Sequence, residues 1–229
     1  MRRLTRDLLR ARPGHSGDPH YAVTTMLNRY ARAFFTKVLS PLADLLIRLR
    51  ISPDAVTVVG TLGVAVGALA FYPRGELLAG TLVVTAFVFA DTIDGIMARR
   101  LGRPTTWGAY LDSTLDRIGD AAVFGGLVLW YAGGGDSTTM TALALACLIL
   151  GSVVSYSKAR AEGLGMTANV GVAERAERLV VVLLATGLTG LFDLPVQVLG
   201  VVLGLLALAS LVTVVQRILE VRRQALGAT

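Results

Sequence analysis

Apolar residues dominate six stretches of this chain, and short polar segments separate them. Each stretch is roughly 15–22 residues long, close to the ~20 residues that an α-helix needs to cross a bilayer core. We therefore predict an all-α, polytopic membrane protein with six transmembrane helices. The expected spans are residues 54–72, 79–97, 112–132, 138–157, 178–192 and 195–216.

A different pattern precedes the first span. Between residues 35 and 49 apolar side chains recur at helical spacing, while Lys37, Asp44 and Arg48 fall on other faces. This pattern predicts an N-terminal amphipathic helix in the membrane interface, bent at Pro41. A surface helix packed on the bundle would show the same pattern, so that alternative stays open.

The chain reads as a single domain spanning residues 1–229. Residues 1–20 are rich in arginine and lack the apolar core of a secretory signal, which is typical of a mobile cytosolic tail. We assign residues 21–50 to the interfacial helix region and residues 54–222 to the six-helix bundle.

Composition and charge fix the surroundings and the orientation. With 54% hydrophobic residues, 17% charged residues and a mean hydropathy of +0.63, the chain is too apolar for an ordinary soluble domain. Six spans place both termini on one side, and all but one of the 22 Lys and Arg residues lie there, Arg74 being the exception. The positive-inside rule makes that side cytoplasmic, in the plasma membrane. The net charge of +6 favours anionic membrane lipids and calls for no nucleic acid partner.

Histidine and cysteine are too scarce to carry the chemistry. His15 and His20 lie in the predicted tail, and the single cysteine, Cys147, lies in an apolar run. The sequence therefore predicts no histidine base near the span ends, no Cys/His zinc site and no disulfide within the chain. Any reaction must depend on carboxylates, basic side chains and bound metal.

Four aspartates lie at the cytosolic ends of two adjacent spans. Asp91 and Asp94 are three residues apart, and Asp112 and Asp116 are four apart, so each pair shares one helical face. Two helices joined by a short turn would aim all four carboxylates at one point. Crowded carboxylates repel one another, and oxygen ligands suit Mg²⁺, Mn²⁺ or Ca²⁺. Two such ions are the arrangement that catalyses phosphoryl displacement.

Small and basic residues accompany the acids. Gly95 has no side chain and lets a bulky ligand approach the helix, and Ala98 extends the same gap. Arg99 offers a planar fork for a phosphate oxygen. Gly108, one turn before Asp112, allows the second helix to come close to the first or to the ligand.

The whole pattern resembles the signature of the CDP-alcohol phosphatidyltransferase family at every fixed position: Asp91-x2-Asp94-Gly95-x2-Ala98-Arg99-x8-Gly108-x3-Asp112-x3-Asp116. The resemblance implies a homodimeric transferase with two Mg²⁺ ions, for which Mn²⁺ could substitute. It implies that Asp91, Asp94 and Asp112 hold one ion, that Asp91, Asp112 and Asp116 hold the other, and that Asp116 is the general base. It also implies a CDP-diacylglycerol pocket formed by Asp54, Ala55, Val56, Thr57, Gly95, Arg99 and Thr105. Without the resemblance, a helix cap at Ser52 or Asp54 explains the first part of that pocket equally well.

A second polar group lies at the same level of the membrane. Ser155 and Lys158 are three residues apart at the end of one predicted span, and a basic pocket there would select a phosphorylated alcohol. Residues 154–162 and 174–178 are similar to the actinobacterial phosphatidylinositol phosphate synthases within the family. That similarity implies that inositol phosphate is the acceptor and that its phosphate is held by Ser155, Lys158, Arg178 and Arg217. An i,i+4 pair between Glu174 and Arg178 is the alternative.

Other functions stay open at this point. A phosphatidylglycerophosphate synthase also uses an alcohol phosphate as its acceptor, and an ion transporter could use acids in a membrane to bind divalent cations or protons. Asp120 continues the helical face of Asp112 and Asp116 but matches no position of the signature. A structural hydrogen-bonding role and a role in the site are both compatible with its position.

Overall fold

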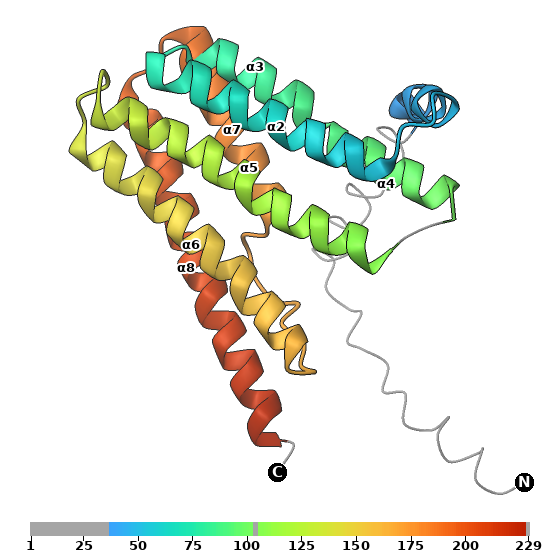
Figure 1. Ribbon diagram of the computed structural model, residues 1–229. Helices are drawn as coiled ribbons and strands as arrows, with labels where there is room; N and C mark the ends of the chain where they lie inside the picture. Colours follow the sequence, from blue (N-terminus) through green and yellow to red (C-terminus); the bar gives the residue numbers. More distant parts are fainter. Residues whose placement is uncertain (1–36, 103–104, 228–229) are drawn as a thin grey trace, which may run out of the picture.

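The computed structural model describes residues 37–102 and 105–227, apart from the side chain of Asp91. The predicted tail and the first part of the interfacial region lie outside these residues. All regular secondary structure in the described part is helical, without a β-strand (Figure 1). After a helix at residues 37–48, the elements are α2 (Pro53–Phe71), the 3₁₀ helix η1 (Tyr72–Arg74), α3 (Leu77–Val88), α4 (Ala90–Arg100), α5 (Thr106–Ala132), α6 (Thr138–Gly163), α7 (Arg175–Phe192) and α8 (Val196–Gly227).

Four segments of the described chain are long and apolar enough to cross a membrane: Pro53–Arg74, Leu77–Arg100, Thr138–Gly163 and Val196–Gly227. Helices α5 and α7 coincide with the other two predicted spans. They fall short of the same criterion because each carries several charged side chains in its N-terminal part. The protein is thus an all-helical, multi-pass membrane protein, and a count of six spans stays a prediction.

The second predicted span, residues 79–97, lies within the candidate span Leu77–Arg100. Two helices make up this segment, because α3 ends at Val88 and α4 begins at Ala90. The apolar run passes through this break, so its hydropathy gives no sign of it. Close packing on α2 accompanies the break, because a Cβ at Gly60 would lie only 2.5 Å from the Cβ of Ala90. The start of α4 can therefore approach the α2 backbone closely.

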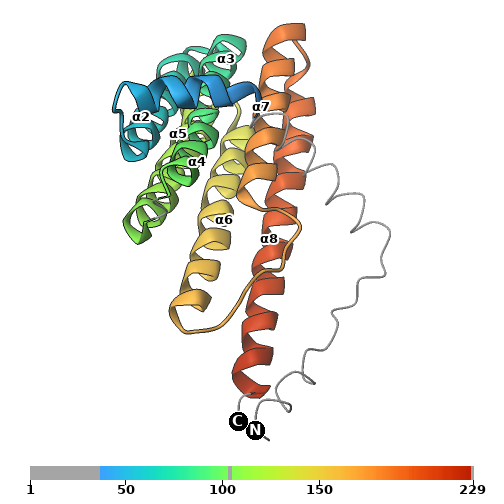
Figure 2. The ribbon, with the colours of Figure 1, turned by 90° about the vertical axis from the view of Figure 1, so that its right-hand side faces the viewer.

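The helix at residues 37–48 lies across the bundle helices rather than along them, as Figure 2 shows. Ala43 is fully buried against Ile93, Ile96 and Met97 of α4. An ion pair between Arg100 and Asp44 adds to this contact. The helix continues across Pro41 without a break. One face therefore packs on the bundle, as the open alternative proposed.

The opposite face of the same helix stays apolar and exposed, through Val38, Leu42 and Leu45. Such a face suits the headgroup boundary of a bilayer, so the interfacial location also stays a prediction.

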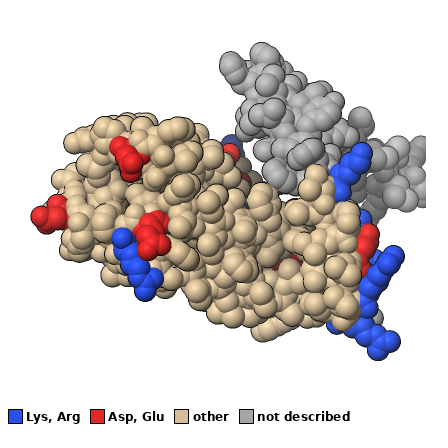
Figure 3. All heavy atoms as spheres, turned by 90° about the horizontal axis from the view of Figure 1, so that it is seen from above, with Lys and Arg blue, Asp and Glu red and all other residues tan. Residues whose placement is uncertain are grey.

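The main core lies between α2, α3 and α5 to α8, around buried residues such as Tyr72, Val84, Phe124 and Leu203. Helix α2 packs on α3, α4 and α5, and α6 packs on α8. Figure 3 shows one face on which charged side chains gather near the two ends, with a broad uncharged band between them. A band of this kind suits contact with lipid tails.

Candidate active site

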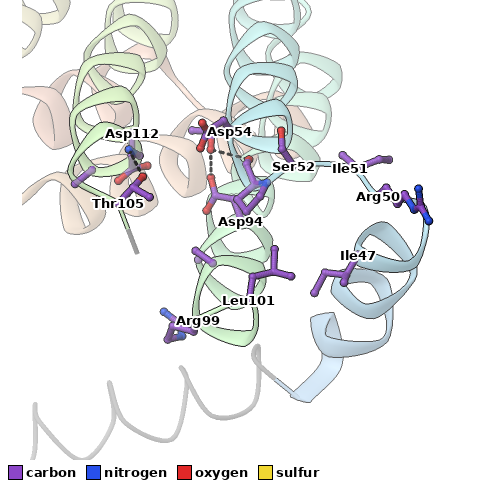
Figure 4. A pocket seen from close by; sticks show the side chains of 16 residues that line it. Ile47, Arg50, Ile51, Ser52, Asp54, Asp94, Arg99, Leu101, Thr105 and Asp112 are labelled. Carbon is purple, nitrogen blue, oxygen red and sulfur yellow. Dashed lines mark hydrogen bonds between the residues drawn. The ribbon is translucent and has the colours of Figure 1, made fainter. Parts of the chain in front are cut away.

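A cavity of about 680 Å³ opens where the helix at residues 37–48 meets the N-terminus of α2, helix α4 and the start of α5 (Figure 4). Polar side chains from the three later elements face an apolar wall that includes Ile47, Ile51 and Leu101. The cavity therefore combines an acidic, hydrogen-bonding part with a part suited to an apolar chain.

The first turn of α2 is fixed by a helix cap. The Ser52 hydroxyl accepts a hydrogen bond from the Ala55 amide at 3.2 Å, and Pro53 occupies the first helical turn. This cap places Asp54 and Thr57 at the cavity. A helix cap and a nucleotide contact are therefore compatible, because Ser52 forms the cap while Asp54 and Thr57 face the cavity.

The predicted CDP-diacylglycerol residues divide into two groups. Those that line the cavity are Asp54, Thr57, Gly95, Arg99 and Thr105. Ala55 and Val56 do not line it: Ala55 is exposed outside the cavity, and Val56 packs against the apolar cluster of α4. The side chains of successive helical residues point in different directions, which explains why Asp54 and Thr57 line the cavity and Ala55 and Val56 do not. A contact of Ala55 or Val56 with the nucleotide stays a prediction.

Thr57 contacts one of the predicted metal ligands. Its hydroxyl donates to the Oδ2 atom of Asp94 at 2.5 Å, and both residues are buried. The Pro53 carbonyl, 3.1 Å from the same hydroxyl, is a competing acceptor, because a threonine hydroxyl has one proton. Thr57 therefore orients the Asp94 carboxylate. No local sequence pattern indicates this contact, because the two residues are 37 positions apart.

Asp112 is exposed and lines the cavity from α5, opposite Asp94 on α4. Asp116 lies one turn further along α5 and is partly buried. Asp91 belongs to the first turn of α4, but its side chain is outside the described residues. Among the side chains that are described, no three acids, histidines or cysteines gather closely enough to hold a metal. The convergence of all four acids thus stays a prediction.

The donor set nevertheless fits a hard divalent cation. Asp94 and Asp112 present carboxylate oxygens to one cavity from two different helices, and the hydroxyl of Thr57 fixes one of them. Oxygen donors of this kind select Mg²⁺ or Mn²⁺ over softer metals.

Asp116 also lies in a network of charges that the sequence pattern missed. The Nη1 atom of Arg175, the first residue of α7, is 2.6 Å from Oδ1 of Asp116, and Nη2 of Arg117 is 3.6 Å from Oδ2. Arg175 also contacts Asp120, at 3.1 Å. Arg175 follows Asp116 by 59 positions in the chain, so no local spacing could have indicated it.

The predicted acceptor residues meet around residues 151–158 of α6, but the arginines are already engaged. Arg178 is 1% exposed and donates to the carbonyls of Ala173 at 2.9 Å and Gly151 at 3.4 Å. The hydroxyl of Ser155 donates to the same Gly151 carbonyl at 3.1 Å.

Arg217 is also engaged, being 2% exposed. It donates to the carbonyls of Val154 at 2.5 Å and Val170 at 3.0 Å. Its Nη2 atom is 3.6 Å from Glu174, whereas Arg178 pairs with Asp120 at 3.4 Å. Within the described residues, the alternative pair between Glu174 and Arg178 does not form.

Lys158 differs from the two arginines. It is partly exposed, and it makes no hydrogen bond or ion pair with any side chain that the structure describes. An ammonium group without a protein partner can bind an external anion at a lower cost than a buried, engaged guanidinium. Of the four predicted residues, Lys158 is best placed to hold a phosphate.

Comparison with known proteins gives consistent matches. The family model for CDP-alcohol phosphatidyltransferases matches residues 50–219. A phosphatidylinositol phosphate synthase of Streptomyces avermitilis is 57% identical over 208 residues, covering 89% of this chain and 85% of that protein. The phosphatidylinositol phosphate synthase of Mycobacterium tuberculosis strain H37Rv is 43% identical, over 82% of this chain and 87% of that protein.

Two solved structures of the Mycobacterium tuberculosis phosphatidylinositol phosphate synthase resemble this fold. One, with CDP-DAG bound, has a TM-score of 0.76 and 43% identity, covering 81% of this chain and 94% of that chain. The other, in complex with manganese and citrate, has a TM-score of 0.75 and the same identity, covering 79% and 87%. The likeness therefore extends over most of both proteins.

Proposed function

Because the chain belongs to the CDP-alcohol phosphatidyltransferase family, and is an enzyme of that class, we propose that it transfers the phosphatidyl group of CDP-diacylglycerol to 1D-myo-inositol 3-phosphate and releases CMP. The observation that carries this proposal is the 57% identity, over 89% of the chain, to a phosphatidylinositol phosphate synthase. The cavity supports it, since acids and an apolar wall suit an amphiphilic nucleotide lipid.

In the proposed reaction, an acceptor hydroxyl oxygen attacks the β-phosphorus that carries the diacylglycerol group. A phosphorus–oxygen bond forms, the bond from that phosphorus to CMP breaks, and the hydroxyl proton passes to the Asp116 carboxylate. Arg99, which lines the cavity, compensates the negative charge on the departing CMP. Asp54 and Thr105 line the same cavity and would contact the nucleotide.

The acids of α4 and α5 would hold two divalent ions. Asp91, Asp94 and Asp112 would hold one, and Asp91, Asp112 and Asp116 the other. Bound Mg²⁺ or Mn²⁺ would supply charge neutralisation at the phosphates and acidify the acceptor hydroxyl. A manganese-containing relative and the oxygen donors of Asp94 and Asp112 support this assignment. Thr57 would keep Asp94 in position for the metal.

Six spans, with α5 and α7 included, would place both termini and the cavity on the cytosolic side of the plasma membrane, and the helix at residues 37–48 in the interface. The basic residues at that side support the orientation. We further propose that the single domain works as a homodimer, as the family resemblance implies.

The test of this function is a comparison of acceptors. Purified protein with CDP-diacylglycerol and Mg²⁺ would be offered inositol phosphate, free inositol, glycerol 3-phosphate and serine separately, and CMP release would be measured. We expect rapid release with inositol phosphate and little with free inositol. If the protein prefers glycerol 3-phosphate, the proposed acceptor is wrong, while the proposed transfer reaction stands. Absence of metal-dependent CMP release with every acceptor would favour a transporter instead.

Lys158→Ala tests how the acceptor phosphate is held. If the ammonium group binds that phosphate, we expect the KM for inositol phosphate to rise roughly ten- to a hundredfold, because a hydrogen bond to a charged group contributes about 1.5–3 kcal/mol. The KM for CDP-diacylglycerol should barely change. Arg160→Ala is the matched control, because Arg160 is exposed and two residues further along α6, on another face.

An unchanged KM for inositol phosphate in the Lys158→Ala protein would show that Lys158 does not bind the acceptor phosphate. Arg178→Ala is a less direct probe, because it also removes one of the two arginine partners of buried Asp120. Its effect would therefore combine changes in binding with changes in stability.

A further inference from the structure

Asp120 accepts ion pairs from two arginines at once. It lies on α5, one turn beyond Asp116, and is 9% exposed. Its Oδ1 atom is 3.1 Å from Nε of Arg175, and its Oδ2 atom is 3.4 Å from Nη2 of Arg178. Both arginines belong to the first turn of α7. One buried carboxylate therefore joins α5 to the start of α7 through two separate contacts.

The first contact reaches the proposed base. The guanidinium of Arg175 touches Asp120 through Nε and Asp116 through Nη1, the latter at 2.6 Å. A guanidinium is planar and rigid, so an anchored Nε also fixes the direction of Nη1. The position of Asp120 consequently sets where Arg175 meets the Asp116 carboxylate.

The second contact neutralises Arg178. This guanidinium is 1% exposed, and its other described partners are two backbone carbonyls, which carry no charge. A buried cation is costly without a counter-charge, and Asp120 provides one. The same carboxylate thus fixes the arginine that packs against the acceptor-side helix α6 at Gly151.

We propose that Asp120 is a positioning residue for the transfer reaction. Through Arg175 it orients the Asp116 carboxylate, and through Arg178 it fixes the acceptor-side helix α6 relative to that carboxylate. The inference rests on the proposed function for the role of Asp116. It gives Asp120 and Arg175 a role in the reaction, although neither is one of the eight fixed positions of the family signature.

Loss of the Asp120 charge has a definite consequence in this geometry. An asparagine keeps the size of the side chain but offers one oxygen, so it can accept from one arginine and sets an NH₂ group against the other. Arg175 would then lose its anchor on Asp120 and keep its contact with Asp116. A guanidinium held closely on that carboxylate competes with a divalent cation for its oxygens.

The experiment compares Asp120→Asn with the parent protein, with Asp193→Asn as the matched control. Asp193 is an exposed residue in the connection between α7 and α8, and asparagine tolerates its φ of +47°. We expect Asp120→Asn to lower kcat roughly ten- to a hundredfold. Mn²⁺ binding to the substrate-free protein, followed by electron paramagnetic resonance, should weaken severalfold. CDP-diacylglycerol binding should stay at the parent level, because Asp120 does not line the cavity.

A double-mutant cycle separates positioning from folding. Arg175 is only partly buried, and Arg175→Lys keeps its charge but removes its planar fork. The substitution replaces neither residue of the buried pair between Asp120 and Arg178. We expect Arg175→Lys to reduce kcat and Mn²⁺ affinity by itself, and to add little in the Asp120→Asn background, because the two changes break one link. If the Asp120→Asn protein does not fold, the Arg175→Lys protein alone tests the proposal.

Two results would overturn the proposal. One is additive effects of Asp120→Asn and Arg175→Lys on kcat. The other is lowered thermal stability with kcat and Mn²⁺ affinity at parent values in both variants. The assays use whichever acceptor the parent enzyme prefers, so a different acceptor would revise the proposed function without deciding the role of Asp120.

Discussion

Asp112→Asn is expected to abolish phosphatidyl transfer while the helices stay folded. Asp112 is exposed and lines the cavity opposite Asp94, so its replacement by an isosteric amide costs little stability and removes one negative charge from the proposed bridging position. Loss of an outer-shell partner of a metal already costs roughly 10- to 100-fold, and loss of a shared ligand should exceed that range. CMP release with Mg²⁺ measures the effect.

Asp136→Asn provides a control with the same chemical change. Asp136 is exposed in the loop between α5 and α6, far along the chain from the cavity residues, and its φ of +38° suits asparagine. Asp116→Asn should be as severe, because it also removes the proposed base. Asp94→Asn should be milder, because only one ion would lose a ligand. Near-parent turnover by well-folded Asp112→Asn protein would refute the two-metal proposal.

Gly95→Leu should prevent binding of CDP-diacylglycerol without unfolding the protein. Gly95 lines the cavity, and a Cβ there would meet only the Arg99 guanidinium, at 3.5 and 3.9 Å, which is ordinary contact. The leucine side chain can therefore occupy the cavity without moving a backbone. Glycine is about 0.8–1 kcal/mol less favourable than alanine inside a helix, and leucine ranks close to alanine, so thermal stability should hold or rise. Equilibrium binding of a labelled CDP-diacylglycerol measures the loss.

Gly125→Leu is the matched control for this prediction. Gly125 is a helical glycine of α5 whose added Cβ would have no neighbour within 4 Å, and it is not among the cavity residues. It should gain the same helix propensity and keep its affinity. If Gly95→Leu protein binds CDP-diacylglycerol as tightly as the parent, the nucleotide lies elsewhere.

Hydropathy and spacing predicted those features that local sequence determines. The six helical regions follow from composition, and the shared face of Asp112 and Asp116 follows from the pitch of a helix. The break at Phe89 could not be predicted, because the apolar run is continuous there and the close contact between Gly60 and Ala90 is tertiary. Contacts between residues far apart in the chain therefore determine where such a helix break occurs.

The same limit explains the missed contacts of the site. Thr57 with Asp94 and Arg175 with Asp120 join residues 37 and 55 positions apart. The burial of Arg178 and Arg217 could not be predicted either, and their role at the acceptor phosphate stays a prediction. Basic residues at span ends favour exposed, ligand-binding positions, yet the structure buries both against backbone carbonyls. Sequence indicates that a charge is present, whereas packing decides whether the charge remains available to a ligand.

The apolar wall of the cavity suits the entry of a lipid. Ile47 and Ile51 form part of that wall, and the helix that carries Ile47 also exposes Leu42 and Leu45 on its outer face. With that helix in the membrane interface, as proposed, a substrate with two acyl chains would enter sideways from its own leaflet, and its tails would not pass through water. The soluble acceptor would arrive from the aqueous phase. The surface density of the lipid in the leaflet, and not its bulk concentration, would then set how often the cavity is filled.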